Sequence, residues 1–243
     1  MAKASRRSKR RKSGGGFFRR LFQLTALLAL VALVYAGWFW FEMRSWRPSP
    51  DIYPEQGAVI ASGAAGVRFE TLKATGAQFV FLELGPAGSA PDPGFGTRLD
   101  AAKAAGLKVG IVQRFDPCQR ADPQSALFTR MVARDSDLLP PALALIAMPE
   151  TCEGRVSEAA VTSEILTLIN QIEMHTGQSV ILKLGADFEM AFGLASAIDR
   201  DLWLLRDRIR PRYAVRPWLL WSANGQLVNG AVNEPLEWVV VQQ

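Results

Sequence analysis

Histidine and cysteine are the scarcest reactive residues of this 243-residue chain, which has one histidine, His175, and two cysteines. A Ser-His-Asp triad, a Cys-His pair or a histidine-rich metal site each needs an imidazole beside other reactive groups. His175 precedes Thr176 and Gly177 at the end of a helical pattern, where a cation caps a helix. Two cysteines are too few for a structural zinc site but can form a disulfide outside the cytoplasm. We therefore expect neither a metal nor a cofactor.

Acidic residues are missing from residues 1–20, which hold nine of the lysines and arginines. The rest of the chain has 19 basic and 23 acidic residues, so the net charge of +5 resides in this tail. A nucleic-acid-binding domain spreads its cations over a surface patch. The sequence therefore excludes nucleic acid as a partner and predicts a basic cytoplasmic tail that contacts anionic lipid.

Charge is also absent from Leu21–Phe41, a run of 21 residues. A helix of that length spans about 31 Å, the thickness of a hydrocarbon core. Trp38 and Trp40 lie where an aromatic belt is expected, and the cations before the run place the N-terminus in the cytoplasm. The alternative is a cleaved signal peptide, with "VYA" before Gly37 as its cleavage site. We expect a single-pass anchor in a bacterial inner membrane, a proline-rich linker over 42–56, and a periplasmic domain over 57–243.

Apolar segments alternate with helical patterns in the domain. Strands are expected at 58–62, 78–84, 107–113, 142–148, 179–184, 202–205, 217–222 and 236–241. Helices are expected at 68–76, 95–106, 122–134 and 161–177. Such repeats imply parallel strands with right-handed crossovers. The fold class is therefore α/β, an irregular TIM-like (β/α)5(β)3 barrel behind an N-terminal transmembrane helix. Its ligands would bind at the C-terminal strand ends. The alternative, an open doubly wound sheet, needs a glycine-rich phosphate loop, which "SGAAG" at 62–66 only weakly approaches.

Several motifs occur together in a fixed order. They are "GAQFVFLEL", "DPGF" at Asp92–Phe95, "RLDAAKAAGLKVGIVQRF", "DLLPPALAL", "HTGQSVIL" and "WLLWSANGQLVNGAVN". In this order they resemble the family-25 glycoside hydrolases, the lysozyme-type muramidases that cut peptidoglycan. The resemblance runs from about Gln56 to Val241. It implies the same barrel, with five strand-helix units followed by three strands.

The acid positions of the family are where this sequence departs from it. The resemblance implies an Asp at the end of the first strand and Asp-x-Glu at the end of the fourth, but these positions hold Val59, Ala144 and Ile146. Gln113 stands where a histidine is common, and Ser222 where the closing segment has glutamine. Glycoside cleavage needs an acid for the leaving oxygen and a second carboxylate or the substrate's acetamido group. The sequence therefore predicts a degenerate active site. We expect Val59→Asp, Ala144→Asp and Ile146→Glu to lower stability, because they bury carboxylates in apolar surroundings.

Four other acids follow strands and are candidates for relocated catalytic groups: Glu83, Asp116, Glu150 and Asp187. Glu83 is the most notable of them because it lies inside an apolar strand run. For each of the four, a solvated rim acid is the more ordinary interpretation.

Substrate contacts are expected from Gln113, Trp203 and Trp221, with Trp218 and Trp238 as further aromatic candidates. Sugars stack on aromatic rings, although burial in a core is the commoner fate of a strand tryptophan.

The two cysteines follow neighbouring strands in the predicted barrel, Cys118 the third and Cys152 the fourth. Adjacent parallel strands lie about 4.8 Å apart, so loops leaving them can bring two Cα atoms to disulfide distance. We predict that these cysteines pair, which would narrow any groove at this end of the barrel.

Three functions remain open on the sequence. The domain is a non-catalytic module that binds peptidoglycan or another envelope glycan, a working hydrolase with relocated acids, or a scaffold for another envelope protein. Aromatic residues in an open groove would favour the first, a paired acid in the groove the second, and a filled groove the third.

Overall fold

The computed structural model describes residues 15–85, 91–134 and 137–242. The chain divides into two compact units, Met1–Arg44 and Ser45–Gln243. Most of the predicted basic tail lies outside the described residues. The second unit begins one residue before Trp46, so the segment expected to be a free linker belongs largely to the barrel unit.

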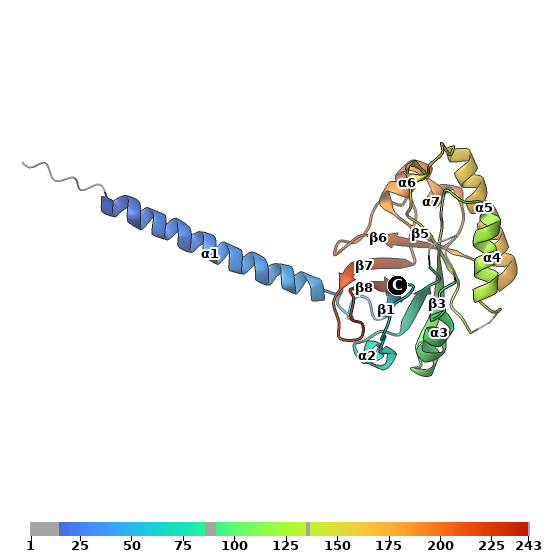
Figure 1. Cartoon of the computed structure of the whole chain (residues 1–243), viewed down its shortest axis with the longest axis horizontal. Helices are drawn as coiled ribbons and strands as arrows, with labels where there is room; N and C mark the ends of the chain where they lie inside the picture. The colour runs from blue at the N-terminus through green and yellow to red at the C-terminus, as the bar shows by residue number, and fades with distance from the viewer. Residues whose placement is uncertain (1–14, 86–90, 135–136, 243) are drawn as a thin grey trace, which may run out of the picture. The chain divides into compact units, whose positions relative to one another are not determined.

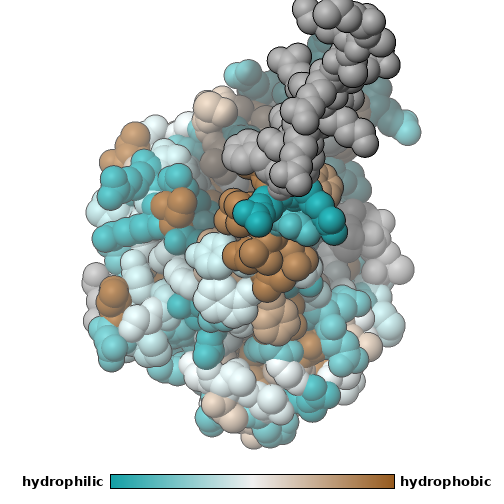
Figure 2. Space-filling model, turned by 90° about the vertical axis from the view of Figure 1, so that its left-hand side faces the viewer, coloured by the Kyte–Doolittle hydropathy of each residue, from teal (hydrophilic) through white to brown (hydrophobic). Residues whose placement is uncertain are grey.

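Helix α1 (Gly15–Ser45) is the long apolar helix that the sequence predicts. Its stretch Arg19–Ser45 is long and apolar enough to cross a membrane, and none of it is buried. Length and composition fit both an anchor and a signal sequence. On the barrel, by contrast, Figure 2 shows a mainly hydrophilic surface with scattered hydrophobic residues.

Eight strands form the barrel that the sequence predicts (Figure 1). They are β1 (Gln56–Ile60), β2 (Phe79–Glu83), β3 (Lys108–Arg114), β4 (Ala142–Leu145), β5 (Ile181–Leu184), β6 (Leu202–Leu205), β7 (Leu220–Leu227) and β8 (Leu236–Val241). Neighbours from β1 to β7 pair in parallel, whereas β8 is antiparallel to both β7 and β1 and closes the barrel.

The helices cover the outside of the barrel (Figure 1). They are α2 (Phe69–Ala74), α3 (Phe95–Ala104), α4 (Ala121–Met131), α5 (Glu158–Thr176), α6 (Ala186–Phe192) and α7 (Leu194–Ala197), with the short 3-10 helix η1 (Pro149–Thr151) after β4. Helix α5 has a stripe of buried residues at helical spacing, starts at the Ser157 cap, and stops at Gly177, which has a φ of 75°. Only glycine adopts that conformation readily. Helices α6 and α7 follow β5, where the predicted barrel has a fifth helix for which the sequence analysis gave no residue range.

Aromatic rings fill the barrel interior. Phe79 and Phe81 point inward, and Phe81 packs against Trp203 with ring centroids 4.8 Å apart. The rings lie where Gly57 and Gly110 leave room, since a Cβ at either glycine would come within about 2.4 Å of a ring atom. The half of the barrel interior at the N-terminal ends of the parallel strands is therefore a packed core and not a channel.

Residues 46–55 lie along the outside of the barrel beside β7 and β8, which are not followed by a helix. The Nδ2 of Asn224 on β7 donates to the Trp46 carbonyl at 2.9 Å, and Tyr53 packs edge-on against Trp221. The Trp238 Nε1 donates to Gln56 at 2.7 Å. This segment takes the place of a covering helix and buries the tryptophans of the last two strands.

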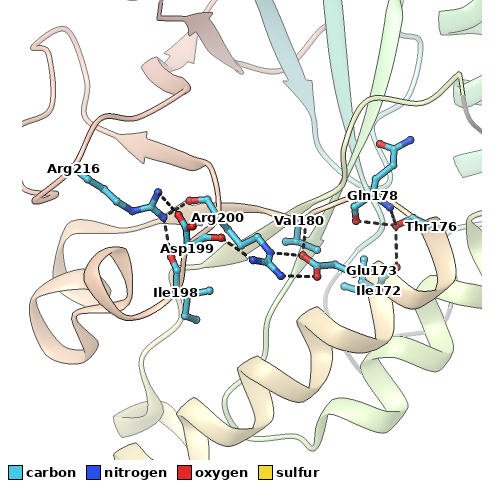
Figure 3. A network of polar contacts seen from close by, with 9 residues as sticks. All are labelled: Ile172, Glu173, Thr176, Gln178, Val180, Ile198, Asp199, Arg200 and Arg216. Atoms are coloured by element: carbon cyan, nitrogen blue, oxygen red, sulfur yellow. Dashed lines mark hydrogen bonds and ion pairs between the residues drawn. The ribbon is translucent and has the colours of Figure 1, made fainter.

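A polar network joins the elements at the N-terminal ends of β5 and β6 (Figure 3). Glu173 near the end of α5 accepts hydrogen bonds from Arg200 at 2.6 and 2.9 Å and from the Val180 amide at 2.9 Å. The hydrogen bonds from Arg200 hold the pKa of Glu173 below its ordinary value although burial opposes this. Arg216 donates to the carbonyls of Ala195, Ile198 and Arg200. These bonds fix the base of the barrel, opposite the end where ligands are expected.

Candidate functional site

The C-terminal ends of the strands surround a pocket of about 290 Å³, called the mouth pocket here. Its lining comes from β1, β2, β3, β7, β8 and the loops beside them, and includes Val59, Glu83, Arg114, Glu234 and Glu237. A smaller cavity of about 130 Å³ at the opposite end of the barrel has mostly apolar walls. Of these two pockets, only the mouth pocket brings several polar side chains together, and it is therefore the candidate site.

The three positions that lack the family's acids lie at this end of the barrel. Val59 and Ala144 are buried and belong to the inward-facing cluster, while Ile146 is 42% exposed just beyond the end of β4. The expectation that these positions are buried in apolar surroundings is therefore confirmed for Val59 and Ala144. It is wrong for Ile146, because this residue follows the end of β4 and lies exposed on the rim.

A buried polar network lies in the barrel interior at the level of Val59 and Ala144. Lys183 on β5 is 1% exposed, and its Nζ donates to the Glu237 carboxylate of β8 at 2.7 Å. The same ammonium lies 4.4 Å from the centre of the Trp203 ring. Ser222 donates to the other Glu237 oxygen and accepts from the Trp203 Nε1 at 2.7 Å. Every member of this network therefore has a partner, as a buried charge requires.

Sequence analysis missed Lys183 and Glu237. A signal was present, because each is a single charge inside an apolar strand, "VILKL" and "LEWVVV". The same feature drew attention to Glu83. In the sheet register, Lys183 pairs with Ala144, and Glu237 pairs with Val59. Each of these charges thus stands one strand away from a position where the family resemblance implies an acid.

Glu83 lies at the end of β2 and lines the mouth pocket, as the sequence led us to expect. Both of its oxygens accept from an Arg114 nitrogen at 3.2 Å, from the end of the next strand. Arg114 remains half exposed. This rim pair places one cation and one anion at the entrance of the pocket.

The other three candidate acids lie outside this pocket. Asp116 accepts from the Cys118 amide at 2.8 Å and from Gln119 at 2.9 Å, so it shapes the loop after β3. Glu150 is exposed on η1, and Asp187 is exposed in the first turn of α6.

The three residues proposed to contact substrate are buried. Gln113 faces the helices by the alternation of β3, and its Oε1 has no partner among the described residues. Trp203 is inside the barrel, and Trp221 lies on its outside, where its Nε1 donates to the Arg206 carbonyl at 2.7 Å. Their contact with a sugar stays a prediction, and it would require these side chains to become exposed.

Two covalent or charged links hold the loops around the mouth. Cys118 and Cys152 form the predicted disulfide, with Cα atoms 5.3 Å apart, and it joins the loop after β3 to η1. Asp92, in the "DPGF" motif, accepts from the Gly63 amide at 2.8 Å and pairs with Arg98. Burial tends to raise the pKa of Asp92, but the bonds from Gly63 and Arg98 outweigh it and lower the pKa. The loops after β1 and β2 are therefore tied together.

Tyr213 connects two strand ends at the same level. Its hydroxyl donates to the Leu184 carbonyl at 2.7 Å and accepts from the Leu205 amide at 2.8 Å, at the ends of β5 and β6. Burial raises the pKa of Tyr213 to about 12. The phenol therefore serves as a neutral hydrogen-bonding link.

Most charged groups at the site are paired. Glu83 pairs with Arg114 and Glu237 with Lys183, whereas Glu234 in the pocket lining is exposed. Among the residues that the structure describes, no three His, Cys, Asp or Glu side chains converge as metal ligands do. The pocket lining mixes these charged groups with the apolar side chains of Val59, Val232 and Leu236.

Comparison with known proteins identifies a family and solved structures that this chain resembles. The family model "Glycosyl hydrolases family 25" matches residues 51–225. A family 25 glycosyl hydrolase from Bacillus anthracis has 20% identity and a TM-score of 0.72, with 81% of this chain and 92% of the other covered. The bacterial lysozyme from Streptomyces coelicolor has 17% identity and a TM-score of 0.67, with coverage of 78% and 92%.

A family GH25 lysozyme from Aspergillus fumigatus has 20% identity and a TM-score of 0.65, with coverage of 78% and 94%. A comparison with curated protein sequences gives no match. At these identities the solved structures show the fold, and the family model covers most of the chain. The chain therefore belongs to glycosyl hydrolase family 25, as its ordered motifs predicted.

Proposed function

We propose that this protein is a membrane-anchored, envelope-facing family-25 domain that binds peptidoglycan or a related glycan without hydrolysing it. One observation carries the proposal: Val59, Ala144 and Ile146 occupy the strand ends where the family resemblance implies carboxylates. Apolar side chains can neither protonate a leaving oxygen nor stabilise the developing cation.

Three acids line the mouth pocket: Glu234 is exposed, and Glu83 and Glu237 are paired with cations. A paired acid in the groove was the feature expected of a hydrolase, but the roles of these two carboxylates in their pairs support the binding function. Glu237 accepts from Lys183 and Ser222, and Glu83 accepts from Arg114. A general acid must present a proton to the glycosidic oxygen. Both carboxylates are instead acceptors within ion pairs, an arrangement that suits binding of sugar hydroxyl groups at the pocket.

Membrane anchoring by α1 belongs to the same proposal. The charge-free run Leu21–Phe41 follows nine cations, which favours a cytoplasmic N-terminus, and the disulfide suits an oxidising compartment. The domain would then face the periplasm from a bacterial inner membrane. We expect a phosphatase reporter fused after Gln243 to be active in a full-length membrane-bound product. Activity of a cytoplasmic reporter alone, or a product shortened near Gly37, would contradict this topology.

A second candidate is a working hydrolase with relocated acids. Glu83 and Glu237 favour it, because both line the pocket that also contains Val59. Strand β1 separates their strands, so their backbones are roughly 10 Å apart.

One experiment separates these functions. Purified protein is incubated with insoluble cell wall, and both the release of reducing sugar and co-sedimentation are measured, with Streptomyces coelicolor lysozyme as the positive control. The variants are Glu83→Gln and Glu237→Gln, with Glu150→Gln as a matched control outside the mouth pocket.

We expect sedimentation with the wall and no release of sugar. Turnover that Glu83→Gln or Glu237→Gln abolishes, and Glu150→Gln leaves intact, would establish the hydrolase and refute our proposal. Neither binding nor release would favour a scaffold for another envelope protein.

A further inference from the structure

The connection between β6 and β7 is unusually rich in arginine. Residues 206–216, called the arginine segment here, hold five arginines and a single acid, Asp207. The arginines are Arg206, Arg208, Arg210, Arg212 and Arg216. The barrel unit as a whole has no such excess, so this segment is a local concentration of positive charge.

Part of this charge is used inside the protein. Arg216 donates to backbone carbonyls at the base of the barrel, and Arg210 lies 5.4 Å from the centre of the Trp218 ring. Arg206 and Arg212 are exposed, and neither side chain forms an ion pair within the described part of the chain. The one acid of the segment, Asp207, accepts from the Gly225 amide at 2.7 Å. At least two guanidinium groups thus remain available to an anionic partner.

Exposed branched aliphatic residues lie between these arginines. Ile209 is 57% exposed and Val215 is 77% exposed. A segment that combines exposed arginines with exposed aliphatic side chains suits the headgroup region of a bilayer, where both kinds of group are accommodated. A purely polar anion in solution would have no use for the aliphatic groups.

Hydrogen bonds to β7 hold the arginine segment near Trp46, the second residue of the barrel unit. The Arg208 amide donates to Ala223 at 2.6 Å, beside the Asn224 side chain that binds the Trp46 carbonyl. Trp46 directly follows Ser45, the last residue of α1. The arginine segment is therefore hydrogen-bonded to the same stretch of β7 that binds the Trp46 carbonyl, and Trp46 is bonded directly to the last residue of α1.

We propose that the arginine segment binds anionic phospholipid headgroups, with Arg206 and Arg212 pairing with phosphates and Ile209 and Val215 entering the interface. The proposal rests on the membrane anchoring proposed above, because α1 must bring Trp46 to a bilayer. Guanidinium groups bind phosphate oxygens in a bidentate manner, which favours arginine over lysine in this role. The occupant of this surface is therefore a lipid leaflet and not a soluble protein.

The test uses the full-length protein in nanodiscs of phosphatidylcholine alone or of phosphatidylcholine mixed with phosphatidylglycerol. Amide hydrogen exchange of residues 206–216 is measured by mass spectrometry. We expect several-fold slower exchange with phosphatidylglycerol, reversed by high salt and by Arg206→Ser with Arg212→Ser. The matched control, Arg130→Ser with Arg155→Ser, removes two exposed arginines elsewhere on the barrel and should retain the protection.

Equal exchange in the two kinds of nanodisc would overturn the lipid proposal. So would protection by soluble cell-wall fragments in phosphatidylcholine nanodiscs, which would assign the segment to an anionic glycan. Failure of anchoring is a separate result, because the protein would then not enter nanodiscs at all. Failure of glycan binding is read independently from wall sedimentation.

Discussion

Glu237→Gln tests the buried polar network under the mouth pocket. The change keeps the size of the side chain but leaves the Lys183 ammonium, which is 1% exposed, without an anion. Removing one partner of a buried pair commonly costs 3–5 kcal/mol. Because Glu237 is 20% exposed and the Trp203 ring lies 4.4 Å from the ammonium, we expect the lower part of that range, about 3 kcal/mol.

The reverse change should cost less. In Lys183→Met the orphaned carboxylate of Glu237 can turn toward water in the mouth pocket and keeps its bond from Ser222. We therefore expect a loss of about 1–2 kcal/mol. The double variant removes both charges and should be more stable than the sum of the single losses predicts, with a coupling energy of about 1–2 kcal/mol. Urea unfolding of the full-length protein in detergent, followed by tryptophan fluorescence, measures all three losses.

The register adds a compensating variant. Ala144 pairs with Lys183 across β4 and β5, so a carboxylate introduced by Ala144→Asp lies within reach of the ammonium. From the sequence we expected this carboxylate to be buried without a partner, and the structure supplies a cation for it. Ala144→Asp should therefore restore part of the stability lost in Glu237→Gln. Additive losses in the double variant, or no recovery with Ala144→Asp, would refute the assignment of this network as a coupled unit.

Three further predictions concern the links around the barrel. Replacing Cys118 and Cys152 by serine should lower the free energy of unfolding by about 3–4 kcal/mol, the chain-entropy value for a loop of this length, in non-reducing urea titrations. Tyr213→Phe should lose about 1–3 kcal/mol, because Leu184 and Leu205 lose a buried partner; an unchanged midpoint would contradict the link. Because the pKa of Glu173 is lowered in the folded state, its contribution is complete above the ordinary glutamate pKa and declines as pH falls toward the lowered value. Unfolding curves at a series of pH values should show a smaller loss of stability at acid pH in Glu173→Gln than in the native protein. An identical pH profile for the two proteins would contradict this role of Glu173.

Periodicity and turn residues predicted most of the barrel but misplaced the bounds of two strands by three residues or more. The fourth strand was expected to reach Met148 and ends at Leu145, because the chain turns there toward η1 and the disulfide. The seventh was expected over 217–222 and runs over Leu220–Leu227, through "SANGQ", which has the composition of a turn. Register shifts against β8 accommodate these residues, so tertiary pairing overrides their local preference.

The candidate site was predictable only in part. Motif order located Val59, Ala144 and Ile146, because the strand ends of a barrel follow from the order of its elements. The Lys183–Glu237 pair joins residues 54 positions apart on strands that are not neighbours in the sheet. Such a contact exists only across a closed interior, so neither spacing nor alternation along the chain reveals it. The tryptophans were equally ambiguous, since a strand residue can face the pocket, the interior or the outer layer.

The placement of β8 has a consequence for the timing of folding. This strand pairs with β7 on one side and β1 on the other, so it supplies both hydrogen-bonded seams that complete the ring. Until residues 236–241 have emerged and arrived, β1 and β7 present open edges, and the interior ion pair lacks Glu237. If the barrel unit crosses a membrane behind α1, in order from β1 to β8, the first seven strands remain in an unfinished state, exposed to chaperones and proteases, until β8 follows. Completion would come in one late step, with the hydrogen-bonded ring and the internal charge balance achieved together.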